Sequence, residues 1–348
     1  MNNLFKKVAC FTDIHFGLRN NSRTHNTDCE EFVKWFIKQA KKAKCETCIF
    51  LGDWHHHRAS INVSTLNYTM SNLEFLSKAF TNVFVIMGNH DLFYRDKREI
   101  NSLEFGKLYD NVHIINSIFT EGDVSIVPWL VQNEWEEMTK IKSKYIFGHF
   151  ELGGFQMNQL VAMPDHGGLG RDHFKNQELV FSGHFHHKSD DGQIYYLGTP
   201  YQIFWNDFDD PKGFHIFDTN TRELERIVNP YILFRKIYYD DTQENYSNHD
   251  VEQYKEQYVK LIVVNKKDLY EFDKFVDRLL VADAYDVKII EDFSEWDASN
   301  VSDDIVKNTE DTMTLLERYV DELDVTLDKN RLKNTMKSLY NEAQDLEL

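Results

Sequence analysis

Five short apolar segments of this chain run directly into aspartate, asparagine or histidine, and this feature restricts the possible folds more than any other. The segments are FTDIHF (11–16), FLGD (50–53), MGNHD (87–91), FGHF (147–150) and FSGHFH (181–186). A tight turn after a strand needs glycine and asparagine for its backbone, but it does not need histidine or aspartate side by side. The pattern therefore indicates strands that end at a common ligand site.

Apolar runs of strand length recur through the first 230 residues, and helical patterns separate the first three of them. In one helical pattern Phe32, Phe36 and Ala40 repeat at four-residue spacing, and Leu66 and Met70 begin a second one. Strand–helix alternation followed by consecutive strands is typical of an α/β sandwich of two sheets flanked by helices. We expect this fold for residues 1–230.

The remaining chain divides into three parts by composition and periodicity. Residues 231–290 contain three strand-like runs and one helical stretch, which predicts a small α+β domain. Residues 291–308 begin with EDFSEWDASNVSDD, which holds six acidic and no basic residues and indicates a solvated linker. Apolar residues at helical spacing in 309–348 predict a helical hairpin.

Composition limits the class of protein. The net charge is −18 and 42% of the residues are apolar, which is typical of a globular protein and unusual for a nucleic-acid binder. Four cysteines are too few for a disulfide scaffold, and the Cys45–Cys48 pair has no second CxxC to complete a zinc site. No apolar run reaches the ~18 residues of a membrane span. We expect a cytoplasmic protein.

The polar strand ends predict a metal centre. In open α/β sheets ligands bind beyond the carboxyl ends of the strands, so these side chains should converge. Residues two apart in extended backbone point the same way, as in Asp13-x-His15 and His184-x-His186. Imidazole and carboxylate ligands suit Mn²⁺, Fe²⁺ or Zn²⁺. Seven candidates are enough for two metals that share a carboxylate, an arrangement that serves in-line displacement at phosphorus.

The ordered set DxH, GD, GNHD, GH and GHxH resembles the calcineurin-like metallophosphoesterase superfamily over residues 6–220. More narrowly, the stretch GTPYQIFWNDFDDPKGFHIFD (198–218), a small capping domain and a helical tail are similar to SbcD-type nucleases, and the compact length is most similar to phage members. The resemblance implies the two-sheet metallophosphoesterase sandwich. It also implies 3′-to-5′ exonuclease action on duplex DNA, single-strand endonuclease action, and a role in recombination and double-strand-break processing.

The resemblance also implies roles for individual residues. Asp13, His15 and His186 would hold one divalent cation, and Asn89, His149 and His184 would hold a second. Asp53 would bridge the two cations, which family resemblance suggests are Mn²⁺, with Mg²⁺ as the other option. His90 would face the scissile phosphate as the catalytic residue. Asp91 is expected to orient His90 as a hydrogen-bond acceptor, and Gly88 to allow the turn.

DNA contacts are harder to assign from the sequence. His56 stands three residues after the bridging aspartate. It lies near the DNA or the metals, or it has no role in the site. Arg58 is a candidate phosphate contact. Arg95, Lys97 and Arg98 follow the GNHD motif and form either a DNA-binding loop or a solvated turn. His55, His57 and His187 are expected to be surface or packing residues.

The expected partners are DNA, an SMC-like ATPase subunit and a second copy of the chain. The hairpin 309–348 would bind the ATPase, with folding back onto the capping domain as the alternative. The helix at 64–79 carries apolar residues on more than one face and would form the homodimer. Two other functions remain open: a bimetal phosphatase acting on a small molecule or phosphoprotein, and a non-catalytic adaptor that bridges ATPase subunits.

Overall fold

The computed structural model describes residues 4–159, 161–165, 168–290, 329 and 332–333. Two compact units divide the chain, Met1–Leu233 and Phe234–Leu348, and each is described by itself. The predicted acidic linker 291–308 lies outside the described residues. The predicted hairpin 309–348 also does, except for residues 329 and 332–333.

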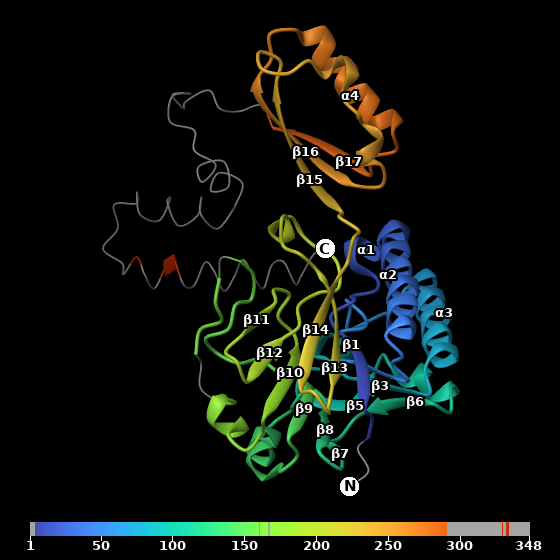
Figure 1. The fold of residues 1–348 in the computed structure, drawn as a ribbon, viewed down its shortest axis with the longest axis vertical. Helices are drawn as coiled ribbons and strands as arrows, with labels where there is room; N and C mark the ends of the chain where they lie inside the picture. Colours follow the sequence, from blue (N-terminus) through green and yellow to red (C-terminus); the bar gives the residue numbers. More distant parts are fainter. Residues whose placement is uncertain (1–3, 160, 166–167, 291–328, 330–331, 334–348) are drawn as a thin grey trace. The chain divides into compact units, whose positions relative to one another are not determined.

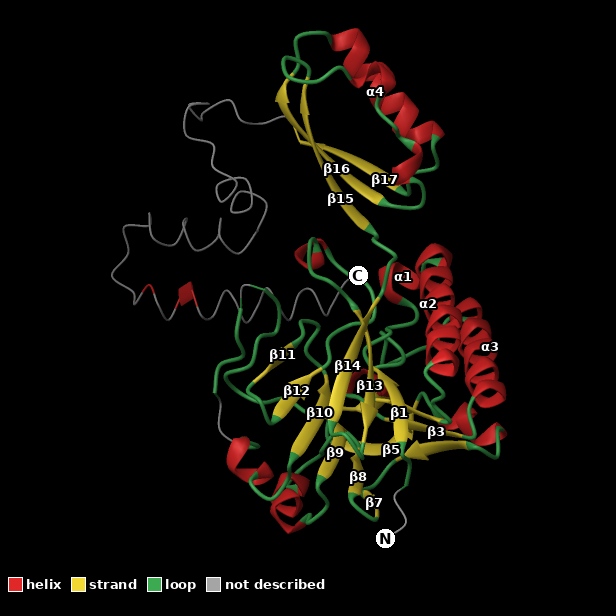
Figure 2. Cartoon of the chain, viewed as in Figure 1, coloured by secondary structure: helices red, strands yellow, loops and turns green. Residues whose placement is uncertain are grey.

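The first unit contains two six-stranded mixed sheets, as Figures 1 and 2 show. The first sheet has the order β14-β13-β1-β2-β3-β6 and the second the order β11-β12-β10-β9-β8-β7. The strands of the first sheet are β1 (Lys7–Phe11), β2 (Thr47–Phe50), β3 (Asn82–Ile86), β6 (Val112–Ile115), β13 (Gly213–Asp218) and β14 (Glu223–Val228). Those of the second are β7 (Phe119–Glu121), β8 (Val124–Val127), β9 (Tyr145–His149), β10 (Leu179–Gly183), β11 (Ser189–Asp190) and β12 (Ile194–Tyr196). The predicted α/β sandwich of two sheets is confirmed.

Strand direction places the polar strand ends together. In the first sheet β1, β2, β3 and β6 run parallel, β13 pairs antiparallel with β1, and β14 pairs antiparallel with β13. In the second sheet β8, β9, β10 and β12 run parallel between antiparallel edge strands. The carboxyl ends of parallel neighbours share one edge of a sheet, which is where ligand sites form in α/β folds.

Alternating side chains on the strands build the core. Val8 and Cys10 of β1 belong to the buried cluster shared by both sheets, whereas Phe11 points to the other face and contacts Phe32 and Phe36 of helix α2. Helices α2 (Arg23–Lys42) and α3 (Val63–Ala79) lie on this outer face in Figure 2, after the short, left-handed α1 (Leu18–Asn21).

The outer face of the second sheet differs from the prediction of flanking helices. A second apolar cluster, which includes Phe150 and Phe174, covers it. Two short 3₁₀ helices contribute to this cluster where longer helices were predicted: η3 (Glu134–Lys140) and η4 (Arg171–Phe174). Among the described residues the rest of the connecting chain is loop, because the segment between β9 and β10 is rich in glycine and lacks a helical apolar stripe.

The second unit is a three-stranded sheet, β15 (Phe234–Asp240), β16 (Tyr258–Asn265) and β17 (Asp286–Ile290), with helix α4 (Leu269–Val281) packed on it. The expected domain was α+β, but all three strands are parallel. Parallel neighbours need a crossover, and α4 supplies the one between β16 and β17, so the unit is built on a β-α-β connection. No helix in the described part of the chain is both long and apolar enough to cross a bilayer.

Candidate metal centre

The seven predicted metal ligands come together at the carboxyl ends of the parallel strands. They follow β1, β2 and β3 in the first sheet, and they stand at or just after the ends of β9 and β10 in the second. Five different strands thus supply one site. The residues are Asp13, His15, Asp53, Asn89, His149, His184 and His186.

One group consists of Asp13, His15 and His186. Each offers a ligand atom within 4.8 Å of the other two. The Nε2 atoms of His15 and His186 are 3.2 Å apart, and His15 Nε2 is 4.0 Å from a carboxylate oxygen of Asp13. This is the set that the sequence assigns to the first metal.

A second group consists of Asp53, His149 and His184, with Asn89 beside them. The amide oxygen of Asn89 lies 3.1 Å from His149 Nε2 and 3.0 Å from His184 Nδ1. The family resemblance implies that Asn89, His149 and His184 hold the second metal, and the structure brings these three side chains together.

Asp53 lies between the two groups. Its Oδ2 atom is 3.4 Å from His149 Nε2 in the second group and 3.9 Å from His15 Nε2 in the first. A carboxylate in this position can contact two cations at once, as a bridging ligand must.

These spacings fit metal coordination. Two ligand atoms at about 2.0–2.1 Å from one metal lie about 3.0–3.4 Å apart at ordinary bond angles, and the closest pairs in both groups fall in this range. His149 Nδ1 donates to the Leu51 carbonyl at 2.7 Å, which leaves Nε2 directed at the site. The donor set, histidine nitrogen with carboxylate and amide oxygen, fits two divalent cations.

Burial keeps two imidazoles of the first group neutral. It lowers the pKa of His186 to about 4 and holds the pKa of His15 well below its usual value. Both rings therefore keep a lone pair at neutral pH, the form that binds a metal. Burial also raises the pKa of Asp13 to about 7.

Asp53 and His149 form a charged pair. Burial alone would raise the pKa of Asp53, but His149 and His90 hold it well below its usual value. Burial likewise opposes the charge on His149, yet the Asp53 carboxylate raises the pKa of His149 to about 9. A divalent cation would take the place of this proton, because ligands bind metals in their deprotonated form.

Several ligands sit on strained backbone. The left-handed φ angles belong to Asp13 (52°), His15 (52°), Asp53 (60°) and His184 (89°). Each such residue costs about 1–2 kcal/mol. Backbone hydrogen bonds hold the first two loops against each other: Asp13 N–H donates to the Gly52 carbonyl at 2.9 Å and His15 N–H to the Asp53 carbonyl at 3.1 Å. Strain of this kind is concentrated at functional sites.

The glycines that precede ligand residues are needed mainly because neighbouring side chains pack against their Cα atoms, and less because a turn requires glycine. Gly88 was expected to allow the turn, but its φ of −89° is open to any residue. A side chain there would place Cβ 2.1 Å from the Asp53 carboxylate. At Gly52 both reasons apply, because φ is +104° and a Cβ would lie 2.4 Å from His149 Nδ1.

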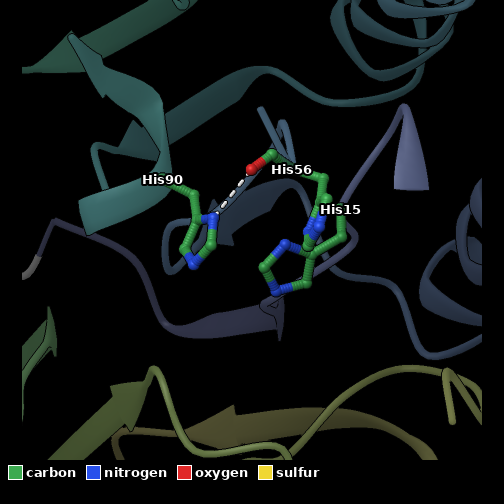
Figure 3. A group of neighbouring side chains, drawn as sticks. All are labelled: His15, His56 and His90. Atoms are coloured by element: carbon green, nitrogen blue, oxygen red, sulfur yellow. Dashed lines mark hydrogen bonds between the residues drawn. The ribbon is translucent and has the colours of Figure 1, made fainter. Parts of the chain in front are cut away.

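His90 lies beside the ligands, in a cluster with His15 and His56 that Figure 3 shows. Its Nδ1 is 2.7 Å from the His56 carbonyl oxygen, so Nδ1–H donates and Nε2 is left for another partner. The ring centroid of His90 is 5.1 Å from that of His15 and 5.4 Å from that of His56. The structure thus brings His56 into the site region, a position that the sequence left open.

Asp91 does not orient His90, contrary to expectation. Its buried carboxylate accepts hydrogen bonds of 2.9–3.0 Å from four backbone N–H groups, which belong to Asp53, Trp54, His55 and Gly88. The His56 carbonyl takes the orienting role, because it accepts the hydrogen bond from His90 Nδ1–H. Asp91 instead fixes the loop that carries Asp53.

The remaining histidines of the motif regions are packing or partly exposed residues. His55 is buried and its ring contacts the hydroxyls of Ser102 and Thr69, and His57 is half-buried. His187 pairs with Asp210 at 2.9 Å. All four cysteines are buried and free, so Cys45 and Cys48 flank the start of β2 without forming a disulfide.

The basic residues near the site divide into two kinds. Arg95 and Lys97 are exposed on the hairpin formed by β4 (Leu92–Tyr94) and β5 (Lys97–Asn101), and Arg58 is half-buried. Arg98, also a candidate DNA contact, is instead engaged by the protein. Its guanidinium makes two 2.5 Å hydrogen bonds to the Glu134 carboxylate and one of 2.7 Å to the Trp129 carbonyl.

Two residues near the second group were not predicted. The Glu151 carboxylate is 3.1 Å from His184 Nε2, and the Trp129 ring lies against His184 and His149, with centroids 5.2 and 5.9 Å away. Glu151 stands two residues after His149 in the segment GHFE, which was a usable signal. Trp129 follows a different strand, β8, and had none.

Comparisons with known proteins agree with this site. Residues 6–203 match the family described as calcineurin-like phosphoesterase. The chain is a homologue of exonuclease subunit 1 of Enterobacteria phage T4, with 29% identity over 97% of this chain and 99% of that protein. The expected metallophosphoesterase resemblance and its narrower form, a phage exonuclease subunit, are both confirmed.

Solved structures that match part of the chain have low sequence identity to it. An archaeal phosphodiesterase is 14% identical, with a TM-score of 0.37 and coverage of 64% of this chain and 99% of that one. A dimetal phosphatase from Danio rerio is 12% identical, with a TM-score of 0.38 and coverage of 62% and 93%. Family membership rests on the profile match to more than half of the chain: this protein belongs to the calcineurin-like phosphoesterase family.

Proposed function

We propose that the chain is the nuclease subunit of a DNA-processing complex and hydrolyses DNA phosphodiesters at a two-metal centre. One observation carries the proposal: the Asp53 carboxylate lies between two ligand groups, 3.4 Å from His149 and 3.9 Å from His15. This arrangement occurs in a chain that is related over its full length to an exonuclease subunit. A bridged pair of cations suits in-line displacement at phosphorus.

The proposed ligands are those that the sequence assigns. Asp13, His15 and His186 would hold one cation, Asn89, His149 and His184 would hold the other, and Asp53 would be shared by both. When bound, the two cations supply Lewis-acid neutralisation of the charge that develops on the scissile phosphate. The mixed nitrogen and oxygen ligands support Mn²⁺ as the physiological ion, with Mg²⁺ as the alternative.

His90 is the proposed general acid. Its Nδ1–H donates to the His56 carbonyl at 2.7 Å, which fixes the ring and leaves Nε2 for another partner. A proton on Nε2 can then pass to the sugar oxygen as it leaves. Neutral His56, whose pKa burial lowers to about 2, packs beside this ring and keeps a second charge away from it.

The proposed specificity and partners follow the relatives and the sequence. The chain would act as a 3′-to-5′ exonuclease on duplex DNA and as an endonuclease on single strands, in the cytoplasm of the cell (the host cell for a phage protein). Its C-terminal segment 309–348 would bind an SMC-like ATPase, and the second unit would cap the DNA. Helix α3, whose first residue Val63 is 81% exposed, would form a homodimer.

Cleavage of end-labelled DNA tests the proposal. The full chain, with and without its ATPase, is incubated with labelled duplex and single-stranded DNA in Mn²⁺, Mg²⁺ or a chelator. Metal-dependent cleavage from 3′ ends is the expected result. An Asp53→Asn protein should lose cleavage, and Asp110→Asn, at an exposed aspartate outside both the site and the β4–β5 hairpin, serves as the control. Hydrolysis of p-nitrophenyl phosphate without any DNA cleavage would favour the phosphatase alternative and contradict the proposal.

A further inference from the structure

We propose that the segment Thr199–Lys212 is a brace that holds the first metal site and thereby sets its affinity separately from that of the second. Tyr201 and Lys212 are its positioning residues. The inference rests on the ligand assignment of the proposed function, but it concerns metal binding and not cleavage. The segment lies within the stretch 198–218 that the sequence singled out and that the reaction does not use.

Tyr201 holds the loop of Asp13 and His15. Its side chain is 2% exposed, and its hydroxyl donates to the carbonyl of Ile14, the residue between these two ligands. The same hydroxyl lies 3.0 Å from the sulfur of Cys29. Asp13 and His15 both have left-handed φ angles. Such backbone keeps its shape only where its surroundings determine it, and a buried hydrogen bond at its centre does so.

Lys212 holds the loop of His186. It is 3% exposed, and its Nζ lies 2.7 Å from carboxylate oxygens of both Asp207 and Asp210. The same ammonium donates to the His186 carbonyl at 2.9 Å, where the Thr199 N–H also donates at 3.0 Å. Burying three charged groups is costly and contributes little net stability, so we infer that this network serves the geometry of the His186 loop.

The network also fixes the ring of His186. The second oxygen of Asp207 accepts from the backbone N–H groups of Ile203 and Phe204, at 2.8 and 3.0 Å. This turn presents the Phe204 ring nearly parallel to the His186 imidazole, with an interplanar angle of 11° and centroids 6.1 Å apart. The ionic network of Lys212, Asp207 and Asp210 therefore positions both the backbone and the ring of His186.

Support for the second site comes from other parts of the fold. His149 Nδ1 donates to the Leu51 carbonyl at 2.7 Å, and the Trp129 ring packs against His149 and His184. Because the second site also has support outside the brace, a change in the brace should weaken the first cation far more than the second.

Titration of the full-length protein with Mn²⁺ tests the brace. Tyr201→Phe keeps the buried ring and removes the hydroxyl that contacts Ile14. Loss of an outer contact to a ligand typically weakens metal binding about 10- to 100-fold, so calorimetry should show one of two Mn²⁺ ions bound at least about 10-fold more weakly and the other within about 2-fold of wild type. Tyr239→Phe is the matched control, since Tyr239 is a buried tyrosine of the second unit.

A second variant and a direct assignment complete the test. Phe204→Leu leaves the ionic network intact and should weaken the same ion. Anomalous scattering from crystals at subsaturating Mn²⁺ should then show lower occupancy beside His186 than beside His149. Unchanged affinities for both ions, or equal weakening of both, would overturn the brace. Either result leaves the proposed nuclease activity standing, because wild-type cleavage is measured independently.

Discussion

At the scale of single residues, the site separates groups that would hold metal from groups that act around it. His90 belongs to the second kind, since its ring is directed by a backbone carbonyl and its Nε2 stays available. Asp91 also acts around the metals, because its carboxylate is fully used by backbone N–H groups. Changes at the two residues should therefore have different consequences.

Replacing His90 with asparagine should lower the rate of DNA cleavage about 10²- to 10⁴-fold, because the leaving oxygen loses its proton donor. Mn²⁺ affinity should stay close to wild type. With bis(p-nitrophenyl) phosphate the loss should be much smaller, since that leaving group needs no proton. Single-turnover rates on both substrates check this, with His113→Asn as the control. An equal loss on both substrates would contradict the role of general acid.

Replacing Asp91 with asparagine should destabilise the fold by about 2–4 kcal/mol. One carboxylate oxygen accepts from the Asp53 and Gly88 N–H groups and the other from Trp54 and His55. An amide keeps only one acceptor atom and turns its NH₂ group toward two donors. Urea unfolding measures the loss, and Asp96→Asn, which is exposed, should change the free energy of unfolding by less than about 0.5 kcal/mol. A similarly small change in Asp91→Asn would argue against this role.

The ligand residues could be predicted from the sequence because each follows its own strand directly. Glycine, aspartate and histidine at a strand end form a local pattern, and the parallel arrangement brings such ends together. Contacts between distant segments have no such pattern. The Tyr201 hydroxyl donates to the Ile14 carbonyl, 187 positions away in the sequence. The hydrogen bond from Lys212 to the His186 carbonyl likewise forms only when the loop between them is folded. The prediction for Asp91 was wrong for the same reason. Its carboxylate accepts from N–H groups of the loop that follows β2, and only the folded chain brings that loop close to Asp91.

At the scale of elements, the β4–β5 hairpin carries charges that face either solvent or protein. Arg95 and Lys97 are exposed, whereas Arg98 ties the hairpin to Glu134 and to the Trp129 carbonyl. A run of basic residues in the sequence cannot separate these cases, because the partner of Arg98 is 36 residues away. The hairpin can still contact DNA through its exposed pair.

Replacing Arg95 and Lys97 together with alanine should weaken duplex binding and lower the slope of log K against log salt by about two, one for each lost phosphate contact. Fluorescence anisotropy at several salt concentrations measures this slope. Arg98→Ala should leave the slope unchanged and lower the unfolding midpoint, since it breaks a half-buried ion pair. An unchanged slope in the double variant would mean that the hairpin does not contact DNA.

At the scale of the whole molecule, buried imidazoles dominate the response to acid. Burial lowers the pKa of six of them in the described residues, to about 2–4 or well below the usual value. They are His15, His25, His55, His56, His186 and His215. These rings stay neutral in the folded chain but take up protons after unfolding below about pH 6.5. Asp13 and Asp91 oppose the trend, because burial raises the pKa of each, to about 7 and about 6.

The metal-free protein should therefore lose stability steeply as the pH falls from about 6.5 to about 5. In that range unfolding takes up more protons at the six imidazoles than it releases from the two carboxyls, so the free energy of unfolding rises with pH. Urea midpoints measured in chelator across this range test the sign. A midpoint that is flat or that increases toward acid would show that the buried imidazoles are not neutral in the folded state.

The central claim of the account is that one carboxylate joins two cations at the strand ends. Crystals of the full chain grown with Mn²⁺ and measured at the manganese absorption edge test it most directly. The account predicts two anomalous peaks about 3.5–4 Å apart, with Asp53 between them, one peak beside His15 and His186 and the other beside His149 and His184. A single peak, or two peaks that Asp53 does not join, would contradict it.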